Sequence, residues 1–145
     1  MNILNIAIIL FIVLESLNIM VLYFNPDTKY GNGVAVFKHW ETTKNDKYAH
    51  LFIKYLINWI ANAKLIFILL LIVLLVWGDN TIKMYSIIAM IVSIGMYYWR
   101  LHPLIDALDQ AGYINPKGYS KKLILMIAAM QGLFVISLIV YFISK

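Results

Sequence analysis

The stretch that decides the fold is LINWIANAKLIFILLLIVLLVW, residues 56–77, in which Lys64 is the one charged side chain. A transmembrane helix needs ~20 mostly apolar residues to cross the hydrocarbon core of a bilayer. Three further runs of this kind lie at residues 3–24, 82–99 and 123–143. Because the backbone amides inside a bilayer must be hydrogen-bonded internally, runs of this length predict helices and not the ~10-residue strands of a membrane barrel.

The composition predicts the same class of protein. Of the 145 residues, 63% are hydrophobic and 13% are charged, whereas roughly a quarter of the residues of a soluble domain are charged. So few charged side chains cannot cover a soluble globule, and the connections between the runs are too short for a separate soluble domain. We therefore predict an all-α integral membrane protein in which residues 1–145 form a single domain, with four transmembrane helices in an antiparallel bundle.

The first run is predicted to be a retained span and not a cleaved signal peptide. Residues 1–5 contain no Lys or Arg, no small-residue cleavage site is evident, and Glu15 lies within the apolar stretch. The chain also has no cysteine. This excludes a disulfide, a thiolate metal ligand and a thiol nucleophile.

The first two connections differ in character. In the first, Asn45 is a plausible N-cap, and residues 46–54 are expected to extend the second span by an amphipathic turn or two at the membrane surface. The second connection is a tight turn, because Gly78 suits the end of one helix and Asn80 or Thr81 can cap the next. The second and third spans are therefore expected to form a helical hairpin.

The third connection is expected to contain a short interfacial helix. Pro103 suits the first turn of a helix and Gly112 suits its end, which predicts a helix over residues 103–111. A turn at residues 115–118 follows. Ser120 is then expected to cap the fourth span.

Lysine and arginine gather in two of the three connections. The first holds five lysines, the third holds Arg100 with three lysines, and the second holds only Lys83. Because short loops rich in these residues stay in the cytoplasm, we predict cytoplasmic first and third connections and non-cytoplasmic termini. The net charge of +5 then lies beside the bilayer, where anionic headgroups would attract it, and nucleic acid is not an expected partner.

Polar side chains inside the spans are the first candidates for a functional site. Glu15, Lys64 and Gln131 belong to three different spans, and each lies about 12–14 Å from the cytoplasmic end of its run at ~1.5 Å per residue. Three asparagines lie nearer that end. The predicted intramembrane polar layer consists of Glu15, Lys64, Gln131, Asn18, Asn58 and Asn62.

Two interpretations of this layer compete. In the structural one, a Glu15–Lys64 ion pair and the neighbouring amides fix which helix faces which, with each interhelical hydrogen bond contributing about 0.6–2 kcal/mol. In the functional one, Glu15 binds a proton, an ion or a polar substrate. Lys64 could instead extend toward the interface, in which case the pair would not form. The structural interpretation is favoured, because a pore needs polar residues along a whole helix face and residues 65–76 are entirely apolar.

A second set of candidates is predicted on the cytoplasmic face. His102, Asp106 and Asp109 are spaced i, i+4 and i+7 and would project from one side of the short helix. His39 and His50 in the first connection could complete a site for a divalent metal such as Zn, Mn or Fe. The set lacks the close His spacing of known zinc motifs, so a solvated helix face is the favoured explanation of these residues and no cofactor is predicted.

Other sequence patterns bear on function. Ala89-x-x-x-Ser93 and Ala128-x-x-x-Gly132 would let helices approach closely, and packing within the bundle is their expected use. The chain has neither a glycine-rich phosphate loop nor a Gly-x-Ser-x-Gly elbow.

These features favour a non-enzymatic accessory or packing subunit of a membrane complex. Its expected contacts are lipid and other membrane helices, from further copies of the chain or from a partner subunit. One alternative is a small transporter or channel that uses the intramembrane polar layer. The other is a membrane-surface metalloenzyme that uses His102, Asp106 and Asp109 with His39 or His50.

Overall fold

The computed structural model describes residues 2–29 and 33–144. Within them, four helices are long and apolar enough to cross a membrane. They are α1 (Ile3–Phe24), α3 (Lys47–Trp77), a composite helix over Asn80–Gln110, and α6 (Tyr119–Ile143). The described part of the chain is otherwise short helices and turns, so the predicted all-helical fold is confirmed.

Shorter elements complete the chain. The 3-10 helix η1 (Val34–Val36) and the helix α2 (Lys38–Thr43) lie between α1 and α3. The composite helix consists of α4 (Asn80–Met96), the π turn η2 (Tyr97–Leu101) and α5 (His102–Gln110).

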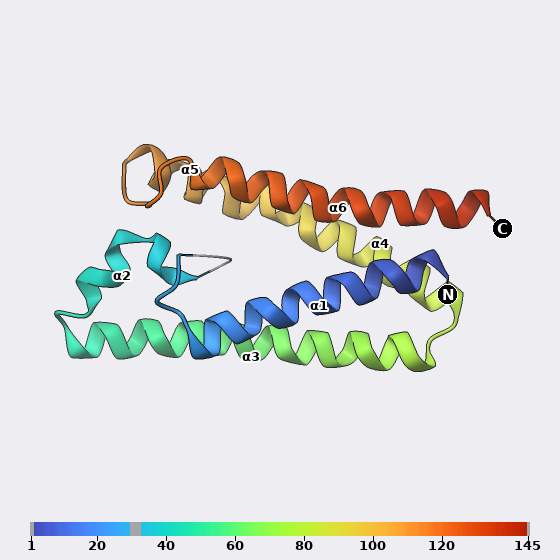
Figure 1. The fold of residues 1–145 in the computed structure, drawn as a ribbon, viewed down its shortest axis with the longest axis horizontal. Helices are drawn as coiled ribbons and strands as arrows, with labels where there is room; N and C mark the ends of the chain where they lie inside the picture. Colours follow the sequence, from blue (N-terminus) through green and yellow to red (C-terminus); the bar gives the residue numbers. More distant parts are fainter. Residues whose placement is uncertain (1, 30–32, 145) are drawn as a thin grey trace.

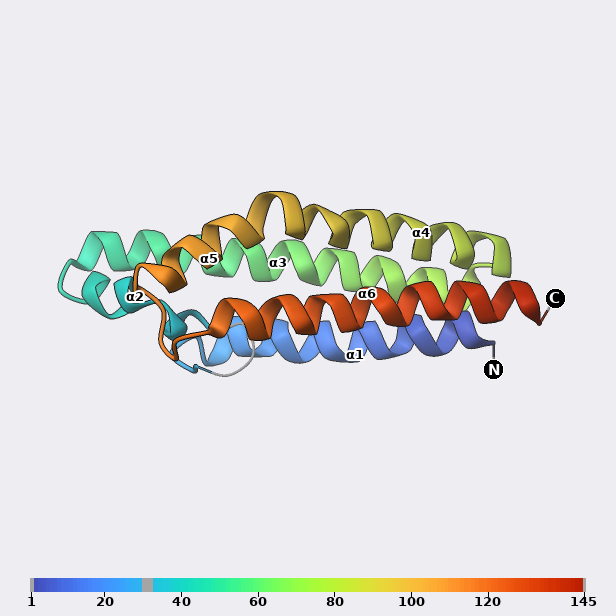
Figure 2. The same ribbon diagram turned by 90° about the horizontal axis from the view of Figure 1, so that it is seen from above.

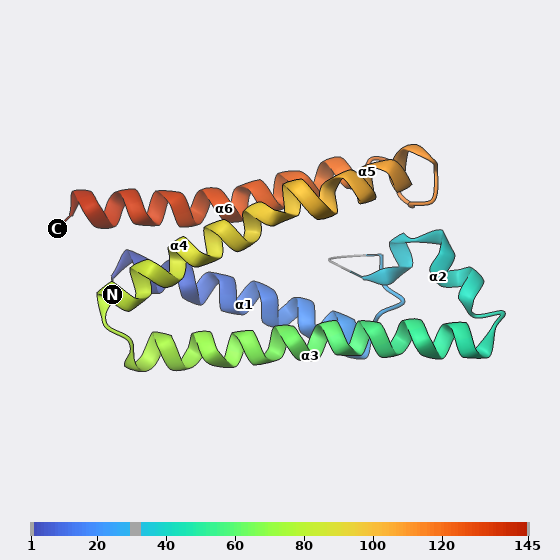
Figure 3. The same cartoon turned by 180° about the vertical axis from the view of Figure 1, so that it is seen from behind.

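The long helices are arranged as two neighbouring pairs. α1 lies alongside α3, and α4 lies alongside α6 (Figures 1 and 2). Both ends of the chain lie at one end of the molecule, together with the turn between α3 and α4, while α2 and α5 lie at the opposite end (Figures 1 and 3).

Packing between the two pairs centres on α1. Phe11 contacts Phe67 of α3 and Phe134 of α6, with ring centroids 6.0 and 5.5 Å apart. Leu4 and Ile8 of α1 are also completely buried. Burial of these side chains on both sides of α1 makes it the helix that joins the two pairs.

The second long helix is longer than its apolar run. α3 begins at Lys47, so the predicted extension before residue 56 is correct. The predicted cap is wrong by one residue: Asp46 Oδ1 accepts hydrogen bonds from the backbone amides of Tyr48 and Ala49 at 2.9 and 3.1 Å. A carboxylate in that position satisfies two unpaired amides of the first turn and favours the helix dipole.

The third apolar run does not end at residue 99 as the sequence suggested. The helix continues through the π turn Tyr97–Leu101 into α5. A proline inside an α-helix lacks a donor and crowds the carbonyl four residues earlier, which for Pro103 is that of Trp99. Trp99 lies within the π turn, so the wider local geometry accommodates the proline and no break is needed.

The end of α5 follows the prediction. Gly112 has a φ of +77°, and the amide of Tyr113 donates to the carbonyl of Leu108 at 2.9 Å. This is the Schellman arrangement, in which glycine adopts the left-handed conformation just after the helix.

The start of α6 differs from the prediction. Ser120 does not cap this helix, which begins at Tyr119 after Gly118 with φ of +83°. Instead, Asp109 of α5 accepts hydrogen bonds from the backbone amides of Gly118 and Ser120, both at 2.9 Å. A carboxylate from another helix thus satisfies the first amides of α6.

The first and third connections are joined to each other. Phe37 and Ile114 form an isolated antiparallel bridge, in which the amide of Lys38 donates to Tyr113 O at 2.9 Å and that of Asn115 donates to Val36 O at 2.8 Å. These two connections therefore form one layer at the α2 and α5 end of the molecule.

Candidate functional site

An ion pair joins α1 to α3 near the middle of both helices. Lys64 Nζ lies 2.8 Å from Glu15 Oε2, and the side chains are 31% and 25% exposed, respectively. Asn18, one turn after Glu15 on α1, donates from Nδ2 to the same Oε2 at 3.4 Å. Glu15 precedes the last residue of α1 by nine positions, so the pair lies about 14 Å from that helix end at ~1.5 Å per residue.

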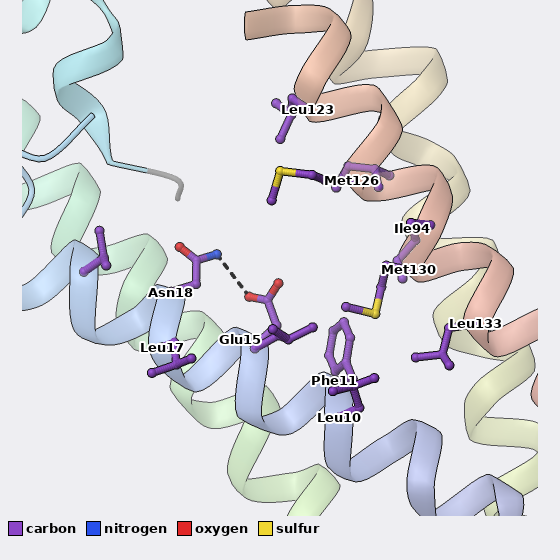
Figure 4. Close-up of a pocket in the computed structure, with 14 residues that line it drawn as sticks. Leu10, Phe11, Glu15, Leu17, Asn18, Ile94, Leu123, Met126, Met130 and Leu133 are labelled. Carbon is purple, nitrogen blue, oxygen red and sulfur yellow. Dashed lines mark hydrogen bonds between the residues drawn. The ribbon is translucent and has the colours of Figure 1, made fainter. Parts of the chain in front are cut away.

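The two oxygens of Glu15 have different surroundings. Oε2 accepts both hydrogen bonds, from Lys64 and from Asn18. Oε1 takes part in no hydrogen bond recorded among residues 2–29 and 33–144. It points away from Asn18 toward the side of α6 (Figure 4).

A cavity of about 640 Å³ lies on that side of Glu15. Its walls come mainly from α1 and α6 and are apolar side chains, with Glu15 and Asn18 as the polar exceptions (Figure 4). No pattern in the sequence predicted the cavity. Met126 and Met130, which line it from α6, are spaced i, i+4, but that spacing is equally typical of a packed helix face.

The remaining members of the predicted polar layer do not meet the pair. Gln131 Nε2 donates to the backbone carbonyl of Ile91 at 3.2 Å, so it joins α6 to α4. Asn62 is exposed and Asn58 is half-buried. Neither forms a recorded hydrogen bond with another described residue. The layer is thus an ion pair with one amide, and Gln131 makes a separate contact.

The five candidates for a metal site are dispersed. The part of the chain that the structure describes contains no group of three or more His, Asp or Glu side chains placed to hold a metal ion. His39 packs on the ring of Tyr113 with centroids 4.8 Å apart. His50 packs on Trp40, and its Nδ1 lies 3.1 Å from Thr43 Oγ1.

The other three candidates have structural partners of their own. His102 Nδ1 lies 3.5 Å from the hydroxyl of Tyr97, and Asp106 accepts hydrogen bonds from Gln110 and from Ser120 Oγ. Asp109 is only 4% exposed and accepts from Ser120 Oγ at 2.8 Å as well as from the amides of α6. The i, i+4, i+7 spacing does place both aspartates on one side, but that side faces the start of α6.

A second ion pair lies outside the long helices. Asp27 accepts from Lys44 Nζ at 2.8 Å and from Trp40 Nε1 at 2.7 Å. Hydrogen bonds from Lys44 and then from Trp40 lower the pKa of the Asp27 carboxyl below its usual value. The carboxylate is therefore the form that holds α2 against the end of α1, and protonation at acidic pH would weaken the contact.

The small-residue patterns do not pack inside the bundle as expected. Ala89, Ser93 and Ala128 are exposed. A Cβ added to Gly132 would meet no atom within 4 Å beyond its chain neighbours and the nearby backbone of its own helix. Ala89, Ser93 and Ala128 therefore lie on the outer surface of α4 and α6, and not in the packed interior.

Comparison with known proteins gives no relative. No protein-family model matches the chain, and no curated protein or solved structure is significantly similar to it. The charge pair, the cavity and the outward surfaces are the features of the molecule that bear on its function.

Proposed function

We propose that this chain is a four-span membrane protein that acts by association, as a non-enzymatic accessory or packing subunit of a membrane complex. The four long helices would cross the bilayer as an antiparallel bundle. The Glu15–Lys64 pair would hold α1 against α3 within the hydrocarbon layer, and the outer surfaces of the bundle would contact lipid and the helices of other subunits.

The observation that carries this proposal is the outward position of the small-residue patterns on α4 and α6. Small side chains at i and i+4 let two membrane helices approach closely, and such contacts are a common means of helix association in bilayers. Here Ala89, Ser93 and Ala128 are exposed, and the space beside Gly132 is open. Moreover, only 17% of the most apolar stretch of α3 and 11% of that of α6 is buried, which leaves much helix surface for further contacts.

The orientation is part of the same proposal. The first and third connections carry most of the cations, and the bridge between Phe37 and Ile114 joins them. Loops rich in lysine remain cytoplasmic, so both connections would lie on the cytoplasmic face and both termini on the other. Anionic headgroups on that face would attract the lysines.

The proposal predicts that larger residues in the small-residue surfaces disrupt the complex. Ala89→Leu and Ala128→Leu should each reduce the amount of co-purifying membrane protein, or of dimer, at least tenfold, because a leucine holds the partner helix away. Both side chains are exposed, so the thermal stability of the chain in mild detergent should stay unchanged. The measurement is quantitative pull-down from native membranes, with the mass of the complex.

Ala63→Leu is the matched control, because Ala63 is an exposed alanine of α3 outside both patterns. It should leave the complex intact. A wild-type chain that purifies as a monomer with no protein partner would contradict the proposed function. So would equal losses for Ala63→Leu and the two test variants.

One observation favours a small transporter or channel as a second candidate: the carboxylate of Glu15 reaches the cavity between α1 and α6. The rest of the cavity wall supports this candidate less. Apart from Asn18 it is apolar, and an ion pathway needs polar groups along its length. Gln131, the third residue of the predicted pathway, is bonded to the backbone of α4.

A further inference from the structure

The cavity between α1 and α6 has the shape of a cleft that opens toward one end of the molecule. The two helices meet at Phe11 and Phe134, whose ring centroids lie 5.5 Å apart. From there they diverge toward the α5 end, and the cavity fills the space between them (Figures 1 and 4). Its volume of about 640 Å³ lies within the roughly 300–1,000 Å³ of small-molecule sites.

The cavity is open to the side. Leu14, Leu17 and Met126 line it, yet they are 43%, 55% and 60% exposed. In a bilayer, the surroundings of these side chains would be lipid tails and not water. A ligand would therefore enter from the membrane, and most of its surface must be apolar.

The polar part of the ligand follows from Glu15. Its Oε1 faces the cavity without a recorded donor from the described residues, whereas Oε2 is already bonded to Lys64 and Asn18. A free carboxylate oxygen in an apolar wall requires a hydrogen-bond donor. The ligand must therefore offer one.

The charge of the ligand follows from Lys64. The ammonium group at 2.8 Å already compensates Glu15, so the site as a whole is neutral. A cationic ligand would add an uncompensated charge in the hydrocarbon layer, and an anionic one would be repelled by the carboxylate. An uncharged donor, such as a hydroxyl group, leaves the site neutral.

The depth of Glu15 narrows the class of ligand further. The carboxylate lies about 14 Å from the end of α1 at ~1.5 Å per residue, well below the level of phosphate headgroups. We propose that the cavity binds an uncharged lipid alcohol, with its apolar body between α1 and α6 and its hydroxyl group donating to Glu15 Oε1. This site is independent of the proposed subunit contacts, which use other surfaces of α4 and α6.

The test uses hexadecanol that carries a photoreactive diazirine, with the full chain in phospholipid nanodiscs. We expect about one labelled probe per chain, mapped by mass spectrometry to cavity residues such as Met126 and Met130. Unlabelled hexadecanol should compete about tenfold to a hundredfold better than hexadecane, because the alkane cannot make a hydrogen bond to a charged acceptor. Palmitate should compete no better than hexadecane.

Two test variants and one control variant locate the site. Ala129→Phe fills the cavity, because Ala129 lines it, and should abolish labelling. Ala63→Phe is the matched control, because Ala63 is an exposed alanine of α3 that neither lines the cavity nor belongs to the small-residue patterns, and this variant should label normally. The double variant Glu15→Leu with Lys64→Met removes the acceptor without leaving a charge unpaired. In it, hexadecanol should compete no better than hexadecane.

Equal competition by hexadecanol and hexadecane in the wild-type chain would overturn the proposal, since the cavity would then hold any acyl tail. Normal labelling of Ala129→Phe would also overturn it. If a photoreactive group at Met126 joined the chain to a protein and not to lipid, a partner helix would occupy the cavity, and the proposed lipid site would be wrong. A wild-type chain that forms its subunit complex but does not bind hexadecanol would overturn the lipid-alcohol site alone and leave the proposed function standing.

Discussion

Lys64→Met is expected to destabilise the chain by about 2–4 kcal/mol in detergent, because it leaves the Glu15 carboxylate without its ammonium partner. Breaking a fully buried pair typically costs ~3–5 kcal/mol, and the partial exposure of both side chains reduces this. Glu15→Gln should cause a loss of similar size, since it leaves Lys64 without a counter-charge. The measurement is the free energy of unfolding, or the midpoint of thermal unfolding, of each purified variant.

The double variant Glu15→Gln with Lys64→Met should recover much of the loss, because two neutral groups do not require a partner. The coupling obtained from the four proteins is the evidence for contact. Lys54→Met on the same helix is the matched control. Lys54 is exposed, so this variant should change stability by no more than about 0.5 kcal/mol. Losses that simply add in the double variant would show that the two side chains do not interact.

The second large effect is expected at Asp109. Asp109→Ala should destabilise the chain by about 2–4 kcal/mol, because it leaves the amides of Gly118 and Ser120 without acceptors at the start of α6. Its carboxylate is almost completely buried, so water cannot readily replace it. Hydrogen exchange at Ser120 should increase together with the loss of stability.

Asp106→Ala is the control for this change. Asp106 lies one turn before Asp109 and accepts from Ser120 Oγ, but it bonds to no recorded backbone amide of α6. Its replacement should cost about 1 kcal/mol or less. If both variants lost the same stability, the role of Asp109 at the start of α6 would be wrong.

The sequence predicted the long helices well, because length and hydrophobicity depend on local composition alone. The first run, residues 3–24, has the same bounds as α1. The last residue of the second run, Trp77, is also the last residue of α3. Local signals also predicted Gly112 at the end of α5. Errors arose where two caps were possible: Asp46 and Asn45 are adjacent, and the carboxylate serves as the cap.

Features that depend on contacts between distant segments were predicted only in part. The depth of Glu15 and Lys64 correctly suggested that they could meet, since two charges at one level in a bilayer favour pairing. The same argument failed for Gln131, because depth does not say which way a helix faces. The i, i+7 spacing of Asp109 did not show that the turn after α5 brings the amides of Gly118 and Ser120 back to its carboxylate. The spacing of the small residues likewise did not show that Ala89, Ser93 and Ala128 lie at the surface.

In the proposed topology, all four long helices cross a membrane and the first and third connections lie on the cytoplasmic face. The absence of native cysteine allows single cysteines at Asn45, Asn80 and Asn115, all exposed, to be labelled without background in intact cells. An impermeant thiol reagent should label only Asn80→Cys, while Asn45→Cys and Asn115→Cys react only after the cells are opened. Labelling of Asn45→Cys or Asn115→Cys from outside, with Asn80→Cys protected, would contradict this orientation, and labelling of only one of Asn45→Cys and Asn115→Cys would contradict the four-span arrangement itself.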